Sequence, residues 1–362
     1  MSYQGLEAIL SGLRAGLARH PALEVLAEEP FYPLKDSGLA HWHVRLGSTK
    51  RLARIPKHSQ MRLSPDANLL YQATCFDRAQ ASGHSPRLQG TLPPAPDLPM
   101  GALVVDWVGG RPARFPQDLD VVVEALAAIH ALPLAAAGAR PPLASPRDNL
   151  AAMLTEIRSQ AKHLDAAGLD PDLRHLLEEE LEWARGLVAG TSRPPRSLIA
   201  FDAHPGNFLI RPNGSAILVD LEKARYAPPG FDLAHATLYT STTWDVESQA
   251  VLDHGQIARA IASWVDLVDP VFARGMRGWF LPLRRLMWLW SISWCAKWRV
   301  LSDKPPRSLE GAEGSAEDWS AARSQAALIA HVKDRVDHYL EPATVDFVRR
   351  EWCDPASPLR DL

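Results

Sequence analysis

The chain has 362 residues, of which 46% are hydrophobic and 22% are charged, and its formal net charge is −3. This apolar fraction and this small net charge exclude disorder as the main state of the chain. At roughly 150 residues per domain, the length indicates two domains or one unit of two lobes. A near-neutral chain lacks the broad basic surface that duplex nucleic acid usually demands, so we expect no nucleic-acid partner, although the composition leaves a local basic patch open.

Three cysteines lie far apart in the sequence, at Cys75, Cys295 and Cys353. Such an odd and scattered set argues against a disulfide framework and against a CxxC metal site. We therefore expect buried thiols in a reducing cytosol, and hence a cytoplasmic protein. The N-terminal segment places Glu7 inside its only apolar stretch, which predicts an amphipathic helix rather than a signal peptide. No uninterrupted apolar run reaches the ~18 residues of a membrane-spanning helix, so we expect no membrane insertion.

The first hundred residues predict mixed strand and helix. Residues 41–46 and 51–55 are β-like runs joined by a short Gly-Ser turn, which predicts a hairpin. Apolar residues at helical spacing predict a helix over 66–82, and residues 101–108 read as a buried strand that stops at a Gly-Gly pair. We expect an N-terminal lobe over residues 1–106.

Beyond the Gly-Gly pair the pattern turns helical. Residues 118–132 and 172–188 carry apolar side chains at helical spacing. Two later β-like runs, 208–210 and 216–221, flank an Asn213-Gly214 pair, which is a strong hairpin signal.

The chain again reads as helical from about residue 256, except over 303–318, where low apolar content predicts a mobile loop that could form a lid. We expect a C-terminal helical lobe over 107–362, with the hairpin inserted in it. The predicted fold class is therefore α+β.

The most informative polar residues lie around that hairpin. Asp202 follows a β-like run, Asn207 lies five residues on, and Asp220 lies thirteen beyond that. Because the hairpin folds the chain back, we expect Asp220 to lie close to Asn207. Two carboxylates and an amide suit Mg²⁺, which prefers hard oxygen ligands. The spacing of Asp, Asn and the second Asp is that of the protein-kinase catalytic loop and metal-binding aspartate.

At these residues the chain resembles the aminoglycoside phosphotransferase and choline kinase superfamily of small-molecule kinases. Its signature is His-Gly-Asp-x-His-x-x-Asn, then Ile-Asp-Phe/Trp-Glu, then Gly-x-x-x-Asp-Leu-Ala. The corresponding stretches here are AFDAHPGN at 200–207, VDLE at 219–222 and GFDLA at 230–234. The resemblance spans about residues 35–300. It implies a bilobal protein-kinase-like fold with a small β-rich N-lobe and a large, mostly helical C-lobe.

The resemblance also implies an ATP- and Mg²⁺-dependent phosphotransferase that acts on a small-molecule hydroxyl. Asp202 would accept the hydroxyl proton, and Asn207 and Asp220 would hold the metal. His204 is expected to support the loop by a backbone hydrogen bond, and Asp232 is expected to tie its helix to the catalytic loop.

The nucleotide phosphates are expected to meet a basic residue in a strand of the N-lobe. Arg54 stands at that position, with Lys57 and Arg51 as nearby rivals. The following helix usually offers a Glu to this basic residue, but the alignment places Gln72 there. An amide can hydrogen-bond a guanidinium but cannot neutralise it.

Two further segments correspond to nucleotide-binding parts of the superfamily. Ser37 and Gly38 lie in the expected phosphate-covering loop, which has one glycine only. Backbone groups of the interlobe hinge would face adenine, and the residues of that hinge are Asp106, Trp107 and Val108.

Departures from the signature motivate an alternative function. Ala200 and Phe201 replace the family His and Gly before the catalytic Asp, and Gln72 replaces the usual Glu. A kinase-like nucleotide-binding module without transfer activity, a pseudokinase, therefore remains a second hypothesis. It is weakened because the base and metal positions are all intact.

A third hypothesis is a metal-dependent phosphohydrolase. It would use Asp202, His204 and Asp220, with His235 as a further candidate. A helical site of the His-Asp type needs adjacent His-Asp pairs, and none occurs in this sequence.

The acceptor is the least determined part. Trp290, Trp294 and Trp298 share one helix stripe, which could pack in the core or bind a quaternary ammonium through aromatic faces. The Trp-rich helix and Arg54 favour a choline-like amine alcohol among the substrates that the resemblance implies. The sequence leaves open the acceptor's identity, the choice of ATP or GTP, and the oligomeric state.

Overall fold

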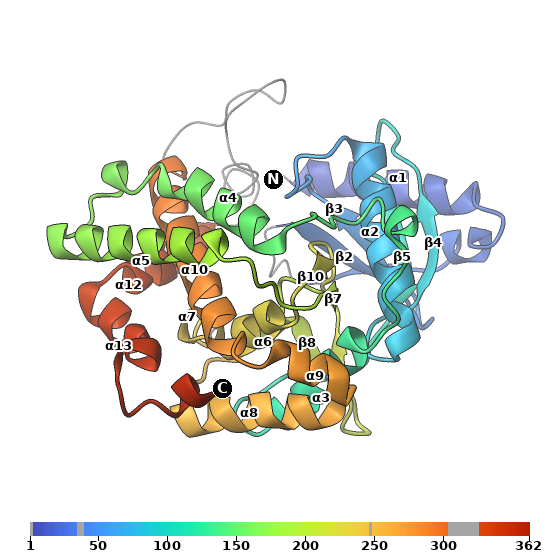
Figure 1. Ribbon diagram of the computed structural model, residues 1–362. Helices are drawn as coiled ribbons and strands as arrows, with labels where there is room; N and C mark the ends of the chain where they lie inside the picture. Colours follow the sequence, from blue (N-terminus) through green and yellow to red (C-terminus); the bar gives the residue numbers. More distant parts are fainter. Residues whose placement is uncertain (1–2, 35–39, 246–247, 303–325) are drawn as a thin grey trace. The chain divides into compact units, whose positions relative to one another are not determined.

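The computed structural model describes residues 3–34, 40–245, 248–302 and 326–362. The described residues form two compact units: one lies within Met1–Gln80, Pro86–Val108 and Leu301–Lys333, and the other within Ala81–Ser85, Gly109–Val300 and Asp334–Leu362 (Figure 1). The expected phosphate-covering residues Ser37 and Gly38, and the loop expected over 303–318, lie outside the described residues.

The first unit is built on a five-stranded antiparallel sheet. Its strand order is β1-β2-β3-β5-β4, with β1 at Phe31–Pro33, β2 at His41–Leu46, β3 at Arg51–Pro56, β4 at Leu88–Leu92 and β5 at Ala102–Asp106. The predicted hairpin is therefore confirmed as β2 and β3. Gly47 takes the left-handed conformation that its turn requires, with φ of 59°.

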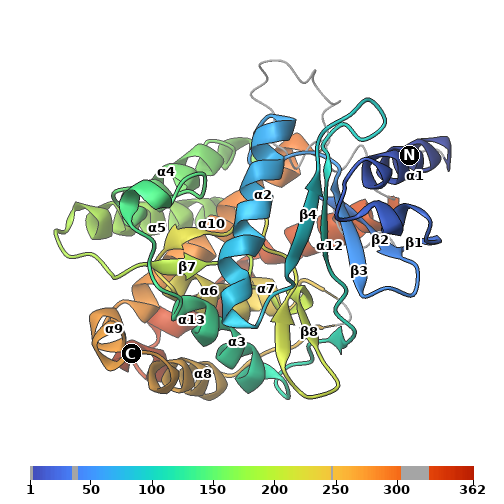
Figure 2. The same cartoon turned by 90° about the vertical axis from the view of Figure 1, so that its right-hand side faces the viewer.

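Two helices cover opposite faces of this sheet (Figure 2). Helix α1 (Tyr3–Ala18) packs Leu13 and Leu17 into a core with Val104 and other alternate strand residues. Helix α2 (Pro65–Ala79) confirms the predicted helix, and Ser64 caps its first turn by accepting from the Ala67 amide at 3.4 Å. The short helices of this region are η1 (Glu24–Ala27) and η2 (Gln80–Ser82).

The second unit contains two small antiparallel sheets. Strands β6 (Arg111–Pro112), β8 (Phe208–Ile210) and β9 (Ala216–Leu218) form one, and β7 (Ser197–Ile199) pairs with β10 (Arg225–Ala227) in the other. The predicted hairpin is confirmed as β8 and β9, and Gly214 has φ of 85° in its turn. The pairing of β7 with β10 was not evident in the sequence, because both strands are only three residues long.

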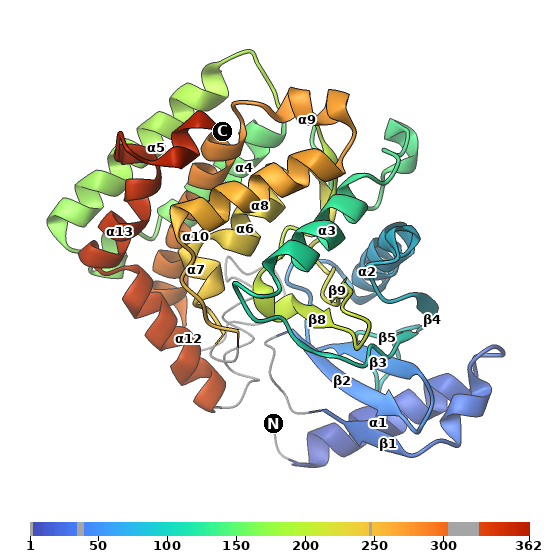
Figure 3. The same ribbon diagram turned by 90° about the horizontal axis from the view of Figure 1, so that it is seen from below.

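Helices make up most of the second unit, and α3 lies beside α8 (Figure 3). The predicted helices over 118–132 and 172–188 are confirmed as α3 and α5. The α-helices from α3 onward are α3 (Leu119–His130), α4 (Asn149–Ala161), α5 (Pro171–Ala189), α6 (Gly230–Thr237), α7 (Tyr239–Thr242), α8 (His254–Leu267), α9 (Pro270–Met276), α10 (Phe280–Leu301), α12 (Ala326–Tyr339) and α13 (Pro342–Cys353). The residues of α12 up to Lys333 belong to the first unit. The short helices are η3 (Ala137–Ala139), η4 (Asp165–Ala167), η5 (Pro205–Asn207) and η6 (Pro358–Asp361).

A buried carboxylate ties three of these helices together. Glu180 on α5 is fully buried and accepts from Arg285 on α10 at 2.5 Å and from Arg349 on α13 at 2.9 Å. Trp352 donates to the same carboxylate at 3.3 Å. A buried charge is tolerated only when it is paired and hydrogen-bonded in this way, so these contacts fix how α5, α10 and α13 pack.

The cysteines follow the sequence expectation in part. Cys75 and Cys295 are buried, but Cys353 is exposed on the last turn of α13, so the expectation of three buried thiols is wrong for that residue. Within the described part of the chain, no helix combines the length and apolar character needed to cross a membrane. The cytoplasmic location stays a prediction.

Candidate active site

The loop after β7 is held by one buried carboxylate. Asp232 on α6 accepts from the backbone amides of Ala200 at 2.7 Å and Phe201 at 2.8 Å. Its third partner is His130 Nε2, at 3.1 Å. Trp264 donates to His130 Nδ1 at 3.0 Å, so His130 must donate from Nε2 to the carboxylate. The prediction that Asp232 ties its helix to this loop is confirmed.

Phe201 occupies a strained backbone conformation, with φ of 62°. A non-glycine residue in this left-handed region costs roughly 1–2 kcal/mol, and the superfamily signature has glycine here. The phenyl ring compensates by packing: its centroid lies 5.4 Å from the Trp290 ring and 6.3 Å from the Phe231 ring. The guanidinium of Arg225 lies 3.6 Å from the same centroid. The loop therefore keeps its left-handed conformation at this position even though phenylalanine replaces the family glycine.

Asp202 is the next residue, and its side chain is largely buried at 18% exposure. Lys223 donates from Nζ to Asp202 Oδ2 at 2.8 Å, and His235 Nδ1 lies 3.8 Å from Oδ1. Burial is the largest influence on the pKa of Asp202 and raises it, but Lys223, His204 and His235 together lower it by more, so the pKa falls below its usual range. The carboxylate is therefore ionised at neutral pH and can accept a proton.

Lys223 was missed by the sequence reasoning. It lies three residues after Asp220, so its position could have been noticed, but the fold was needed to pair it with a residue 21 positions earlier in the chain. Burial lowers the pKa of Lys223. The carboxylates of Asp202 and Glu222 raise it by more than burial lowers it, so the pKa lies above its usual value. The ammonium therefore stays charged beside Asp202.

Two histidines complete the surroundings of Asp202. The rings of His204 and His235 lie 6.3 Å apart. Burial lowers the pKa of His235 to about 4, so its imidazole is neutral at neutral pH. The backbone carbonyl of His204 accepts from the backbone amide of Asn207 at 3.0 Å. The imidazole Nδ1 of His204 is buried without a hydrogen-bond partner among the described residues, so support of the loop by this side chain stays a prediction.

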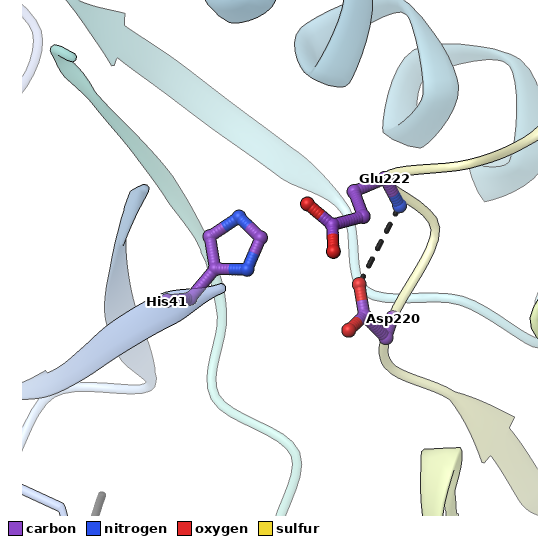
Figure 4. Close-up of side chains that lie close together, drawn as sticks. All are labelled: His41, Asp220 and Glu222. Carbon is purple, nitrogen blue, oxygen red and sulfur yellow. Dashed lines mark hydrogen bonds between the residues drawn. The ribbon is translucent and has the colours of Figure 1, made fainter. Parts of the chain in front are cut away.

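Asn207 and Asp220 are brought together by the hairpin, as expected. The amide of Val219 donates to the Asn207 carbonyl at 2.9 Å, and Asp220 follows at once. Asn207 donates from Nδ2 to the Asp202 carbonyl at 2.8 Å, which leaves its Oδ1 available as an oxygen ligand. Glu222 donates its backbone amide to Asp220 Oδ1 at 3.4 Å, and both carboxylates lie in the turn after β9 (Figure 4). These oxygens fit a divalent cation such as Mg²⁺.

A further acidic group, Asp245, lies against the loop that carries Asp202 and Asn207. A Cβ added to Gly206 would lie only 2.8 Å from Asp245 Oδ2, so this carboxylate fits against the glycine. The preceding residue, Trp244, meets Trp294 with ring centroids 5.7 Å apart and planes at 69°. The sequence reasoning missed Asp245 and Trp244, because no motif marks the segment after α7.

The three tryptophans on one face of α10 differ in whether they pack in the core or could contact a ligand. Trp298 is 4% exposed and belongs to the core. Trp290 and Trp294 are only partly buried. Trp290 also donates from Nε1 to Glu156 at 3.2 Å, so it is held by a specific hydrogen bond. Only the first two tryptophans of the stripe can therefore present a ring to a ligand.

In the first unit, the basic residues expected near phosphate have distinct surroundings. Arg54 is 3% exposed, and its guanidinium lies 5.2 Å from the Phe76 ring centroid. Arg51 forms an ion pair with Asp106 at 3.0 Å. Lys57 is 2% exposed. Arg51, at the start of the interior strand β3, is thus engaged by a carboxylate, which weakens it as a rival of Arg54.

The hinge segment uses part of its backbone inside the first unit. Asp106 donates its amide to the Arg87 carbonyl at 3.0 Å, and Trp107 donates to the Lys50 carbonyl at 3.1 Å. These two donors are therefore committed, which leaves the Val108 amide and the hinge carbonyls for the expected adenine contact.

Comparison with known proteins gives two positive findings. A sequence model described as the phosphotransferase enzyme family matches residues 37–267. No curated protein sequence matches the chain. Among solved structures, the chain is similar to a choline/ethanolamine kinase family protein from Mesorhizobium loti, with 19% identity and a TM-score of 0.54 over 91% of this chain and 99% of that chain.

Two eukaryotic kinases are similar in fold as well. Plasmodium vivax ethanolamine kinase has 12% identity and a TM-score of 0.57 over 89% of this chain and 85% of that chain. Choline kinase from Cryptosporidium parvum Iowa II has 12% identity and a TM-score of 0.54 over 94% of this chain and 99% of that chain. These likenesses confirm the predicted α+β kinase-like fold.

Proposed function

The chain belongs to the phosphotransferase enzyme family, and we propose that it transfers the terminal phosphoryl group of Mg-ATP to a hydroxyl of a small amine alcohol. Membership of this family makes it an enzyme of the small-molecule kinase class. The observation that carries the proposal is the ionised Asp202 carboxylate, which lies on the loop that also supplies Asn207 and is paired with Lys223.

Asp202 is the proposed catalytic base. Its lowered pKa keeps the carboxylate ready to accept the acceptor's hydroxyl proton. Lys223 holds this carboxylate by a hydrogen bond, so we assign it as a positioning residue that fixes the side chain toward the acceptor. Phosphoryl transfer depends mainly on such positioning and on charge neutralisation, rather than on covalent chemistry by the protein.

Asn207 and Asp220 are the proposed metal ligands, and Glu222 is a further candidate beside them. A bound Mg²⁺ would neutralise charge on the phosphates. Asn207 has a second task that needs no metal, since its amide nitrogen binds the Asp202 carbonyl and so holds the base in place.

The first unit would bind the nucleotide. Arg54 is the proposed phosphate contact, because Arg51 is already paired with Asp106. Ser37 and Gly38 remain proposed parts of the phosphate-covering loop. The hinge residues Asp106, Trp107 and Val108 would contact adenine through their backbone, with the Val108 amide as the remaining donor. We propose ATP as the nucleotide because the superfamily that the chain resembles uses it.

The acceptor proposal rests on the charge and aromatic groups beside the loop. Asp245 offers a carboxylate at Gly206, and Trp244 and Trp294 offer aromatic faces next to it. A carboxylate with aromatic rings attracts an ammonium group, and cation–π attraction contributes up to ~2 kcal/mol when the cation is desolvated. The structural neighbours described as choline and ethanolamine kinases support the same class of acceptor.

The alternatives receive less support. The base and the metal-binding oxygens adopt an ordered arrangement that a nucleotide-binding module would not require. The phosphohydrolase hypothesis, which would use Asp202, His204 and Asp220, is less supported because the matching family is one of phosphotransferases.

The test is ADP release from Mg-ATP across a panel of choline, ethanolamine, thiamine, homoserine, sugars and aminoglycosides. We expect release that depends on an amine alcohol and is absent in its deoxy analogue. Mass spectrometry should find the phosphorylated acceptor. Release that is independent of any acceptor would favour hydrolysis. Stabilisation by Mg-ATP in a thermal melt without release would favour the nucleotide-binding module.

A further inference from the structure

The second unit contains a cleft that the proposed reaction does not use. Its volume is about 960 Å³. It is lined by the segment between α3 and α4, by the residues just before β7 and by the start of α9. Ser197 lines the cleft at the beginning of β7, whereas the catalytic loop follows the other end of that strand. At ~3.3 Å per residue, a three-residue strand separates the two places by roughly 10 Å.

Three arginines line this cleft: Arg140, Arg147 and Arg196. None of them pairs with a carboxylate of a described residue. Arg196 donates to the backbone carbonyls of Pro146 at 2.8 Å and Arg147 at 2.9 Å. Arg140 donates to the carbonyl of Ala135 at 2.9 Å and to a serine hydroxyl at 3.3 Å. The exposed Arg147 side chain bonds to no described residue, so three cationic groups converge without an anionic partner.

The nearest carboxylates are committed elsewhere. Asp148 pairs with Arg193 at 2.7 Å and also accepts from the first amides of α4. Asp269 lines the cleft but caps α9, since it accepts from the amides of Val271 at 2.8 Å and Phe272 at 3.1 Å. Burial and the positive charge of Arg140 lower the pKa of Arg196, and the negative charge of Asp148 offsets this lowering only in part. The positive charge in the cleft is therefore poorly compensated.

The remaining lining is mostly apolar. It includes Leu132, Leu134, Pro194, Pro195 and Phe272. Leu134 is 43% exposed, which leaves apolar surface open to a ligand. Clefts of ~300–1,000 Å³ with apolar walls and a few convergent polar groups are the usual form of small-molecule sites.

We propose that this cleft binds a small organic anion that has an apolar body. Its carboxylate, phosphate or sulfonate group would contact the guanidinium groups of Arg140, Arg147 and Arg196, which suit planar oxyanions. Its apolar part would lie against Leu132, Leu134 and Phe272. The acceptor proposed above is a cation, so this ligand belongs to a different chemical class.

The probe for this site is 8-anilinonaphthalene-1-sulfonate, an aromatic sulfonate whose fluorescence rises when it binds. The full chain is titrated with the probe, and the same titration is run on Arg147→Gln and on the double variant Arg140→Gln/Arg147→Gln. Arg147 is exposed and makes no side-chain bond to a described residue, so its variant is expected to fold normally. The matched control is Arg185→Gln, which removes one positive charge from an exposed pair with Glu182 outside the cleft.

We expect Arg147→Gln to weaken probe binding ~10-fold and the double variant to weaken it further, because charge-assisted hydrogen bonds are lost. Arg185→Gln should bind the probe as the unmodified chain does. The uncharged analogue 1-anilinonaphthalene should bind at least ~10-fold more weakly than the sulfonate. Equal affinities in Arg147→Gln and Arg185→Gln, or equal binding of the two probes, would overturn the proposal. Neither outcome would bear on acceptor phosphorylation.

Discussion

Lys223 Nζ lies 2.8 Å from Asp202 Oδ2 and donates a hydrogen bond to it. The two residues come from separate segments, one after β7 and one after β9, and the fold brings them together. Burial raises the pKa of Asp202, and the ammonium is the strongest of the neighbouring groups that together lower it below its usual range. The proposed role of Asp202 as general base would therefore depend on Lys223 as well.

Replacing Lys223 should shift the pH dependence of the reaction. Because Lys223 lowers the pKa of Asp202, Lys223→Met should raise that pKa, and the protonated, inactive form should persist to higher pH. We expect the acidic limb of the kcat/KM profile to move to higher pH and kcat at neutral pH to fall. Lys223→Arg keeps the positive charge and should retain the original limb. If the acidic limb does not move in Lys223→Met, Lys223 does not control the pKa of the group that accepts the proton.

Asp232→Asn should weaken both the loop and the fold. The carboxylate accepts three hydrogen bonds, and an amide can accept at only one of its two polar atoms. Unsatisfied buried donors cost ~1–3 kcal/mol each, so urea denaturation should show a free energy of unfolding lower by about 3 kcal/mol. Folded protein should also have reduced kcat, because the backbone before Asp202 loses its anchor. Wild-type stability would contradict this account of the loop.

Phe201 allows strain and packing to be separated. Phe201→Ala removes the ring and keeps the strained φ, and should cost ~3–5 kcal/mol of stability. Phe201→Gly removes the same ring but accepts φ of 62° without strain, so it should be more stable than the alanine variant by ~1 kcal/mol. Chemical denaturation of the two variants measures the difference. If alanine is the more stable, the backbone at this position is not strained.

Replacing Asp245 should change the KM for the acceptor without changing the KM for ATP. Its carboxylate lies against Gly206 beside Trp244 and Trp294, where an ammonium group is proposed to bind. Asp245→Asn should raise KM for a cationic acceptor about 10-fold, since one favourable charge interaction is lost, and should leave KM for ATP unchanged. A neutral isostere of the same acceptor should show no such change. An equal change in both KM values would place Asp245 outside the acceptor site.

Sequence reasoning was most effective where the signal was local. The β2–β3 and β8–β9 hairpins, α2, α3 and α5 were all predicted from residue periodicity and turn signals. The proximity of Asn207 to Asp220 followed from the Asn213-Gly214 turn alone. These features depend on neighbours in the chain, which a sequence displays directly.

Features that depend on distant parts of the chain were missed. The pairing of Asp202 with Lys223 and the fit of Asp245 against Gly206 each require the tertiary fold. Phe201 illustrates the opposite case, since its departure from the family glycine suggested lost function. Its backbone nevertheless takes the conformation that a glycine would take, because Asp232 and three surrounding side chains hold it there.

The central claim is that Asp202 accepts the acceptor's hydroxyl proton during phosphoryl transfer. The most direct test is a single-turnover measurement of phosphorylated acceptor formed by Asp202→Asn and by the unmodified chain, with Mg-ATP binding measured on both. The rate should fall at least ~10²-fold in Asp202→Asn, as loss of a general base requires, while the Kd for Mg-ATP stays unchanged. A transfer rate in Asp202→Asn close to that of the unmodified chain would contradict it.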